Sequence, residues 1–308
     1  MIGFPVDVRE MMRVFVTGGT GFVGREVIRA LQAHGVLVRC LVRPGSEGDL
    51  RGFEAIDRVP GDVLVTKGIA ESIQGCRAVI HLVGIIREHP ASGVVFERLH
   101  TQATANMVAA AQEAGVHRYL QMSALGVRRE ARSRYHRTKW EAEECVRRSG
   151  LDWTIFRPSV IYGRGDGSIS VLAAMIRRLP VMPVLGAGRY RLQPVAVEQV
   201  AEGFARALDR PATIGKTYEV GGPQSYAFTE ILDQIGMALG KPRVRKLHQP
   251  LAFMRPLVRL LEPFPFFPIT SDQLTMLEEN NVCDPSPFYR DFDLKPIAFP
   301  DGLQAMFS

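Results

Sequence analysis

The chain has 308 residues, of which 46% are hydrophobic and 23% are charged, a composition typical of globular proteins that excludes disordered and fibrous ones. Its 38 Lys and Arg exceed its 32 Asp and Glu and give a net charge of +6, but the two signs are interspersed, so the sequence does not predict nucleic-acid binding. No apolar run approaches the roughly 18 residues that a membrane-spanning helix needs, so we expect no transmembrane span.

The cysteines and histidines are spaced too widely for a metal site. The four cysteines form no CxxC pair, and the seven histidines form no HxH or HExxH motif. These spacings predict free thiols, a cytoplasmic protein and no bound metal. The N-terminal stretch MIGFPVDVREMM contains a proline and two acidic residues, and it lacks the apolar core of a signal peptide.

Short apolar runs alternate with amphipathic segments along the first half of the chain. Runs rich in β-branched residues predict strands at 13–19, 36–42, 56–60, 78–84, 118–124 and 152–163. Segments with helical periodicity between them predict helices at 22–35, 67–74, 95–114 and 135–150. Because strand–helix repetition requires right-handed crossovers, these elements predict an α/β fold with a doubly wound parallel sheet covered on both faces.

A glycine-rich loop joins the first predicted strand to the first predicted helix. Its sequence TGGTGFVG places Gly18, Gly21 and Gly24 in a T-G-x-x-G-x-x-G spacing. Glycine lets the chain turn tightly and approach a pyrophosphate without a Cβ, and the helix that follows offers its free N–H groups to the phosphates. At this position in a βαβ unit the loop predicts a dinucleotide site, the alternative being a tight turn that binds nothing. The predicted contacts in the loop are Gly18, Thr20, Gly21, Phe22 and Val23.

The end of the second predicted strand bears on the choice of cofactor. An NAD site commonly has an acidic residue there to bind the ribose 2′-hydroxyl, but this chain has Val42 followed by Arg43. An arginine can hold a 2′-phosphate through charge-assisted hydrogen bonds, so the sequence favours NADP(H). Two observations leave alternatives open. Glu47 and Asp49 follow closely and are compatible with NAD(H), and Arg43 is also an ordinary residue for a solvated surface.

Tyr135 and Lys139 lie four residues apart in the segment YHRTKWEAEECVRRSG. On a helix this spacing puts both side chains on one face. Without context such a pair is more often part of a solvated helix than of an active site. After the glycine loop and the strand–helix alternation, however, it becomes a candidate catalytic pair.

Several stretches together resemble the short-chain dehydrogenase/reductase superfamily, in particular its extended and atypical members. Those stretches are MRVFVTGGTGFVG, HLVGI, MSALGV, YHRTKWEAE, TIFRPSVIYG and LQPVAVEQVAE. Within the superfamily they are most similar to the group named after the NAD(P)H-binding accessory subunit of respiratory complex I. The similarity runs from about residue 12 to about residue 240. It implies a Rossmann-type fold that binds NAD(P)(H).

The resemblance also implies roles for the candidate catalytic residues. Tyr135 would be the proton donor or acceptor at a carbonyl or hydroxyl, and Ser123 would orient the substrate oxygen. A free tyrosine has a pKa of about 10, which Lys139 and an oxidised nicotinamide would lower. Lys139 would also hold the nicotinamide ribose. Two features depart from the strongest enzymes of the family: a single hydroxyl in QMSALG, and His100 where many members have an asparagine that organises a relay water.

The remaining cofactor contacts come from the resemblance alone. Asp62 and Val63 match the pair that contacts the adenine, although a turn aspartate after a glycine is the alternative. The stretch Leu82, Val83 and Gly84 matches the strand end beside the adenosine and the phosphates. Pro158 matches a position near the nicotinamide, and it would equally stop a strand.

The resemblance further implies that the second half builds a smaller substrate lobe interleaved with the nucleotide-binding half. Residues 12–163 form the predicted Rossmann domain, to which segments near 193–222 return. Residues 164–192 and 223–308 form the predicted substrate lobe, with helices at 170–180 and 228–240. The helix predicted at 197–211 and the strand predicted at 217–223 fall in or next to the segments that return to the Rossmann domain.

The segment 248–270 combines a basic, apolar helix with a run of Phe and Pro. Core packing within the small lobe is one interpretation. The other is a peripheral contact with a partner protein or with the inner face of a membrane, which would suit a lipid or quinone-like substrate.

Two functions are compatible with the whole sequence. The first is an NAD(P)(H)-dependent oxidoreductase or epimerase-like enzyme that acts on a small-molecule carbonyl or alcohol, with Tyr135 as acid or base. The alternative is a non-catalytic NAD(P)H-binding protein that stabilises an assembly or senses the cofactor. The intact Tyr135–Lys139 pair favours the enzyme.

Overall fold

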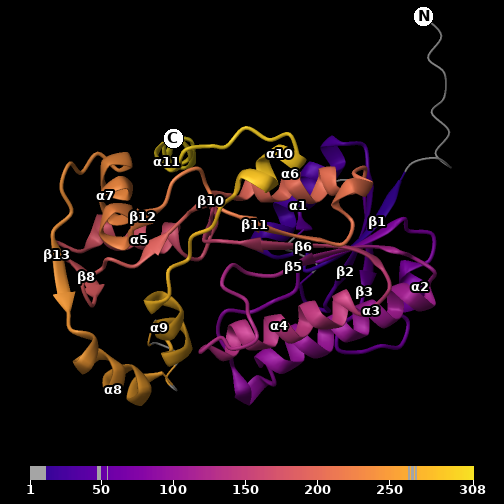
Figure 1. The fold of residues 1–308 in the computed structure, drawn as a ribbon, viewed down its shortest axis with the longest axis horizontal. Helices are drawn as coiled ribbons and strands as arrows, with labels where there is room; N and C mark the ends of the chain where they lie inside the picture. The colour runs from indigo at the N-terminus through magenta and orange to yellow at the C-terminus, as the bar shows by residue number, and fades with distance from the viewer. Residues whose placement is uncertain (1–11, 47–49, 54, 263, 265–266, 268) are drawn as a thin grey trace, which may run out of the picture.

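Seven parallel strands form the central sheet of the computed structural model, which describes residues 12–46, 50–53, 55–262, 264, 267 and 269–308. The strands are β1 (Arg13–Thr17), β2 (Leu37–Val42), β3 (Ile56–Pro60), β4 (Ala78–His81), β5 (Arg118–Met122), β6 (Asp152–Pro158) and β11 (Lys216–Val220). Their order across the sheet is β11-β6-β5-β4-β1-β2-β3 (Figure 1). From β1 the chain therefore builds the sheet in one direction through β2 and β3, and then returns to build it in the other direction from β4. Doubly wound sheets bind their ligands at this switch point, between β1 and β4. The predicted Rossmann-type fold is confirmed.

Helices cover both faces of the sheet, as the near-continuous apolar strands require. One face carries α1 (Phe22–Ala33), α6 (Val197–Ala207) and α10 (Ser286–Asp291). The opposite face carries α2 (Ile69–Ile73), α3 (Ala103–Glu113) and α4 (Arg134–Arg147) (Figure 1). Successive strand residues point to opposite faces, so Val14 and Val16 pack with the first set and Phe15 with the second.

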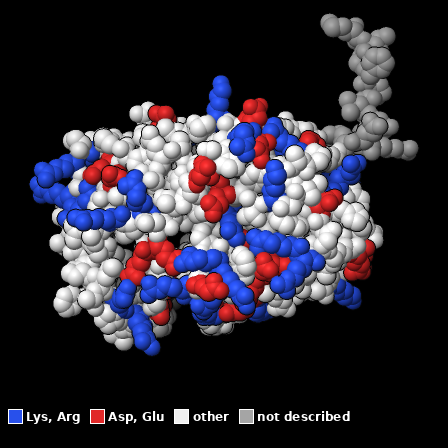
Figure 2. Space-filling model, viewed as in Figure 1, with Lys and Arg blue, Asp and Glu red and all other residues white. Residues whose placement is uncertain are grey.

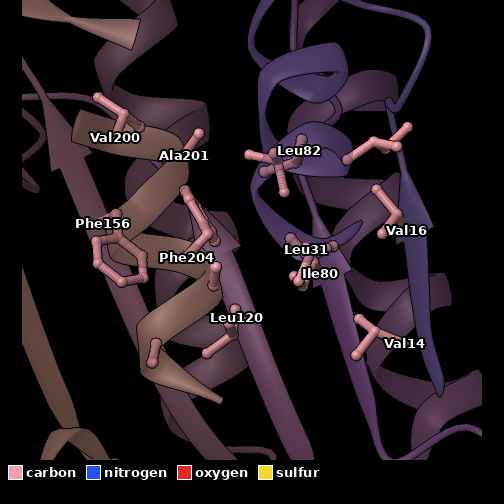
Figure 3. Packing of buried hydrophobic residues seen from close by; sticks show 14 of the residues in the cluster. Val14, Val16, Leu31, Ile80, Leu82, Leu120, Phe156, Val200, Ala201 and Phe204 are labelled. Atoms are coloured by element: carbon pink, nitrogen blue, oxygen red, sulfur yellow. The ribbon is translucent and has the colours of Figure 1, made fainter. Parts of the chain in front are cut away.

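The face under α1 and α6 contains the largest aromatic cluster of the sheet. Figure 3 shows Phe204 of α6 beside Phe156 of β6, and their ring centroids are 4.3 Å apart. Leu31 of α1 packs in the same cluster beside Val16 and Ile80. All five side chains are fully buried. Truncating Phe204 to Ala would therefore cost about 3–5 kcal/mol of folding free energy.

The remaining elements form a smaller lobe with a core of its own, which includes Tyr162, Ile176, Ile231 and Phe299. Its short strands pair as β10-β7, β12-β9 and β13-β8. The strands are β7 (Ile161–Tyr162), β8 (Met182–Leu185), β9 (Arg191–Leu192), β10 (Val195–Ala196), β12 (Tyr226–Ala227) and β13 (Lys246–Gln249). The helices are α5 (Ile169–Arg178), α7 (Phe228–Ala238), α8 (Leu251–Leu261), α9 (Ser271–Glu278) and α11 (Phe299–Phe307). No helix in the described ranges is long and apolar enough to cross a membrane.

Three segments of the second half pack with the large sheet rather than with the small lobe. Strand β11 pairs with β6, and α6 packs beside α1 in the same core cluster. Helix α10 places Phe288 and Phe292 in this cluster as well, although the sequence assigned 223–308 to the small lobe as a whole. The periodicity of the sequence cannot predict which core α10 joins, because the apolar face of a helix has the same spacing in either core.

The observed elements are shorter than the predicted ones where a loop carries the site. Strand β1 ends at Thr17 because Gly18 takes a positive φ of 75°. Strand β4 ends at His81, so 82–84 belong to the loop that follows. The predicted helix at 95–114 starts with a π-helical turn at Glu97–Gln102. The predicted strand at 152–163 divides into β6 and β7.

Candidate functional site

The glycine loop has the shape that a phosphate-binding turn needs. The left-handed φ of Gly18 disfavours other residues, and a Cβ added there would lie 3.0 Å from the carbonyl carbon of Leu82. The amide of Gly21 donates to the Gly18 oxygen at 3.1 Å and closes the turn. A Cβ at Gly24 would collide with that same oxygen. The loop thus approaches both helix α1 and the end of β4 only because these positions lack side chains.

The N-terminus of α1 is available to an anion. Gly21 is its N-cap, and no side chain in the described part of the chain caps it. The first amides of the helix, those of Phe22 and Val23, therefore keep their donors, at the positive end of the helix dipole. Thr20 is half-buried in the loop, and its carbonyl accepts a hydrogen bond of 3.0 Å from Arg25 Nη1. This cradle fits a dinucleotide pyrophosphate.

The end of β2 presents a cation. Val42 is buried as the last residue of the strand, and Arg43 follows it with an exposed side chain. No carboxylate occurs between 42 and 46, while Glu47 and Asp49, which kept NAD(H) open, lie outside the described residues. Arg43 is thus the charged side chain that the described part of this strand end offers to a cofactor.

The predicted adenine contacts lie in a turn after β3. Asp62 Oδ1 accepts from the Leu64 amide at 2.9 Å, so this aspartate does organise a turn, and its second oxygen has no such bond in the structure as described. Val63 is buried, and its carbonyl accepts from Asn106 Nδ2 at 2.8 Å. The turn is thereby fastened to α3 on the ligand-binding side of the sheet.

Lys139 is the most deeply buried cation of the site. It lies on α4 with 3% of its surface exposed, and its Nζ donates to the Met122 carbonyl at 3.2 Å. A Cβ added at Gly84 would lie 2.8 Å from this Nζ, so the loop after β4 closes directly over the ammonium. Burial lowers the pKa of Lys139 to about 8, against the opposing effect of Glu143. Among the described residues, the Met122 carbonyl at the end of β5 accepts a hydrogen bond from this ammonium, and the loop after β4 lies over it.

Tyr135 lies at the start of α4, whose N-cap Ser133 accepts from the His136 amide at 3.2 Å. Its ring packs edge-on against Phe96, His100 and His136, with centroids 5.3–5.8 Å apart. Burial raises the pKa of Tyr135 to about 12. In the protein alone, burial thus moves this pKa opposite to the direction that the resemblance implied, and Tyr135 is a phenol at neutral pH.

The ends of β4, β5 and β6 carry the remaining predicted site residues, which are Leu82, Val83, Ser123 and Pro158. Ser123 is 5% exposed, and its Oγ has no hydrogen-bond partner in the described part of the chain, although its amide donates to the Phe156 carbonyl at 2.7 Å. Leu82 is buried and Val83 is half-buried. Pro158 is the last residue of β6, and its carbonyl accepts from the Leu125 amide at 2.9 Å.

Sequence reasoning missed a row of buried polar residues beneath the site. Thr17, His81 and Gln121 are register partners on β1, β4 and β5, on the face covered by α3 and α4. Thr17 Oγ1 lies 2.6 Å from His81 Nδ1, while His81 Nε2 is unpaired among the described residues. Burial, followed by the charge of Lys139, lowers the pKa of His81 to about 3. Polar residues at matching positions of three apolar strands were the available signal.

His100 was singled out as the residue at a relay position. Its Nδ1 lies 2.9 Å from Thr138 Oγ1, and its Nε2 lies 3.1 Å from the Ile85 carbonyl and 3.2 Å from the Ile85 amide. Both ring nitrogens are therefore engaged by the protein in either tautomer. Burial, with a smaller effect of Lys139, lowers the pKa of His100 to about 2, so the imidazole is neutral. It fastens the loop after β4 to helix α4.

Asp272 of α9 caps the helix that carries the candidate pair, and no sequence signal pointed to it. Its carboxylate accepts from the Arg134 amide at 2.7 Å and from the Tyr135 amide at 3.1 Å. Asp272 and Tyr135 are 137 positions apart in the sequence. An aspartate in the first turn of a helix is expected to stabilise that same helix, so the sequence gave no reason to connect Asp272 with α4. The second half of the chain thus reaches the first turn of α4.

Comparison with known proteins agrees with this geometry. A family model described as NAD(P)H-binding matches residues 18–211. The mitochondrial NADH dehydrogenase [ubiquinone] 1 alpha subcomplex subunit 9 of Arabidopsis thaliana is 31% identical, over 91% of this chain and 73% of its own length. The ceramide reductase of Caulobacter vibrioides is also 31% identical, over 77% of this chain and 74% of its own.

Solved structures share the fold at lower identity. A nucleoside-diphosphate-sugar epimerase from Staphylococcus aureus superposes with a TM-score of 0.76 at 20% identity, over 95% of this chain and all of the other. A dTDP-glucose 4,6-dehydratase from Streptomyces venezuelae, solved with NAD bound, gives 0.72 at 21% identity over 96% of each chain. These likenesses concern the fold, and the nicotinamide cofactor follows from the family match together with the loop.

Proposed function

Because the chain belongs to the NAD(P)H-binding family, in the extended short-chain dehydrogenase/reductase group that includes the complex I accessory subunit, we propose that it is a reductase. It transfers a hydride between NAD(P)H and a carbonyl compound, with Tyr135 as the acid. The observation that carries the proposal is the burial of Lys139, which holds an ammonium under Gly84 and beside the Met122 carbonyl, one helical turn from Tyr135. A solvated surface lysine would not be enclosed in this way.

Each residue of the group has a role in that chemistry. The bound cofactor supplies the hydride. Tyr135, a phenol with a pKa of about 12, donates the proton that the developing alkoxide needs. Lys139, with a pKa of about 8, is largely charged at neutral pH and stabilises negative charge that develops on Tyr135 and the substrate oxygen. The Ser123 hydroxyl, which has no hydrogen-bond partner among the described residues, offers a donor that orients the carbonyl.

The high pKa of Tyr135 favours reduction over oxidation. Alcohol oxidation needs a base, and burial opposes formation of the phenolate. Carbonyl reduction needs an acid, which is the form of Tyr135 that burial favours. We therefore propose NADPH as the working cofactor, with Arg43 as the contact to its 2′-phosphate. The name of the Caulobacter relative, a ceramide reductase, supports an apolar or lipid-like carbonyl substrate.

The test is single-turnover oxidation of bound NADPH in the presence of fractionated small metabolites and lipids, followed by nicotinamide fluorescence. Tyr135→Phe should slow the reaction about 10²–10⁴-fold and leave the NADPH dissociation constant within about twofold. Tyr226→Phe, which removes a hydroxyl bonded to Gln224 in the small lobe, is the matched control and should react at the wild-type rate. Equal rates in wild type and Tyr135→Phe would exclude Tyr135 as the acid.

A second function has one specific observation in its favour. The Arabidopsis relative is named as a subunit of the mitochondrial NADH dehydrogenase, which supports a role as an NAD(P)H-binding member of an assembly. On this alternative the protein retains NADPH without turning it over. Stable fluorescence of bound NADPH with every substrate fraction, in wild type and Tyr135→Phe alike, is the result that it predicts.

A further inference from the structure

Helix α8 presents a row of large apolar side chains to the outside. Phe253, Leu257 and Leu260 are 76%, 41% and 70% exposed and occur at helical spacings of four and three residues. They therefore form one stripe on the helix surface. Only Val258 of this helix is buried. In Figure 2 the lower left of the molecule, where Figure 1 places α8, is largely free of charged side chains, with Lys and Arg at its edge.

One cation lies on the same helix without an ion pair. Arg259 of α8 is exposed and forms no ion pair with the described carboxylates. Arg255 differs, because it binds Glu278 of α9. The surface of α8 thus combines apolar side chains with a free arginine, Arg259, a combination found in helices that lie in the headgroup region of a bilayer.

We propose that α8 docks the protein on a lipid bilayer that carries anionic headgroups, with Phe253, Leu257 and Leu260 inserted and Arg259 beside the phosphates. A second copy of the chain is a poorer occupant, because an isologous contact would set this arginine-bearing face against itself. The net charge of +6 opposes self-association as well and favours an anionic surface.

The docked helix is attached to the candidate active site. Arg87, in the loop after β4, donates to the carbonyls of Phe267 at 2.6 Å and of Glu262 at 3.3 Å, in the connection between α8 and α9. Asp272 then caps the helix of Tyr135. A cavity of about 350 Å³ lies between the two helices and the 185–190 turn, lined in part by Leu185, Leu251, Leu274 and Leu277. Insofar as the proposed reductase function holds, docking places its site beside the bilayer and selects a lipid substrate.

Vesicle flotation tests the docking independently of any reaction. The probes are vesicles of phosphatidylcholine alone and of phosphatidylcholine mixed with phosphatidylglycerol. Wild type should float with the mixed vesicles. The affinity of the double variant Phe253→Gln/Leu260→Gln for these vesicles should be lower by at least about tenfold. Arg259→Glu should weaken binding about fivefold and reduce its salt dependence. Met237→Gln, which removes a 52% exposed side chain from α7, is the matched control and should float like wild type.

Four outcomes would overturn the proposal. They are no flotation of wild type, equal flotation with both kinds of vesicle, undiminished flotation of the double variant, and a concentration-dependent dimer lost in that variant without vesicle binding. Far-UV circular dichroism of each variant establishes that it is folded. Tyr135→Phe should float normally, so that docking and catalysis can fail separately.

Discussion

The carboxyl ends of the central strands and the α8–α9 segment both contact the elements of the candidate site, but by different means. At the strand ends the backbone is confined by close packing, as at Gly18 and Gly24, and the polar groups are buried. Helix α8 buries one residue, and its connection to the site consists of long-range polar contacts from Arg87 and Asp272. The cofactor side is therefore expected to be rigid and intolerant of substitution, and the substrate side to be adjustable.

The largest effect is expected where the backbone is most confined. Gly24→Ala forces a methyl group against the Gly18 carbonyl and should destabilise the protein by about 1–3 kcal/mol. It should also weaken NADPH binding at least tenfold, because the loop moves away from the phosphates. Denaturant unfolding and fluorescence titration measure the two effects. Gly167→Ala, where an added Cβ meets nothing within 4 Å, is the control and should change neither.

The buried histidines should make the strand-end region sensitive to acid. Because the pKa of His81 is lowered to about 3, the unfolded chain binds a proton there below about pH 6.5 that the folded protein does not. Stability from this residue is complete above pH 6.5 and is lost as the pH falls, by up to about 1.4 kcal/mol per pH unit.

His81→Asn should remove the part of the slope between pH 6 and pH 4 that His81 contributes, and His100, whose pKa is lowered to about 2, should keep its own part. Urea unfolding at a series of pH values provides the measurement. The exposed His89 supplies the comparison variant His89→Asn, which should keep the wild-type slope. An unchanged slope in His81→Asn would show that His81 is not the neutral buried group described above.

Arg43 tests the cofactor side at its exposed edge. Arg43→Asp should weaken NADPH binding about tenfold or more and leave NADH binding nearly constant, since a charge-assisted hydrogen bond to the 2′-phosphate is lost. The ratio of the two dissociation constants is the measurement. Arg51→Asp makes the same charge change at a nearby exposed arginine. A similar shift in both variants would indicate general electrostatics rather than a specific contact.

The smallest effect is expected on the substrate side. Asp272→Ala removes a carboxylate that accepts from two amides of α4, which should cost about 1 kcal/mol of folding free energy. It should also lower the single-turnover rate, because the first turn of α4 carries Tyr135. Asp209→Ala, at an exposed carboxylate without a partner among the described residues, should be neutral. A neutral Asp272→Ala would mean that α9 does not hold α4.

The sequence alone determined the elements that depend on local sterics. The β-branched runs, the glycine spacing at 18, 21 and 24, and the four-residue spacing of Tyr135 and Lys139 act within one strand, turn or helix, so they can be read from neighbouring residues. These local signals were sufficient for the sheet and for the tight turn at Gly18, and together with the family resemblance they gave the nicotinamide class of the cofactor. The structure explains why position 84 is a glycine, which the neighbouring residues do not: a Cβ there would lie 2.8 Å from Lys139 Nζ.

Tertiary structure decided what depends on residues far apart in the chain. The pairing of Thr17 with His81, the cap that Asp272 provides to α4, and the assignment of α10 to the large core join segments 64 or more positions apart. The sequence also left open whether 248–270 is core or surface, and the structure shows α8 with a mostly exposed apolar face. Hydrophobic periodicity defines a face, but only the packing of the whole chain determines whether that face is covered.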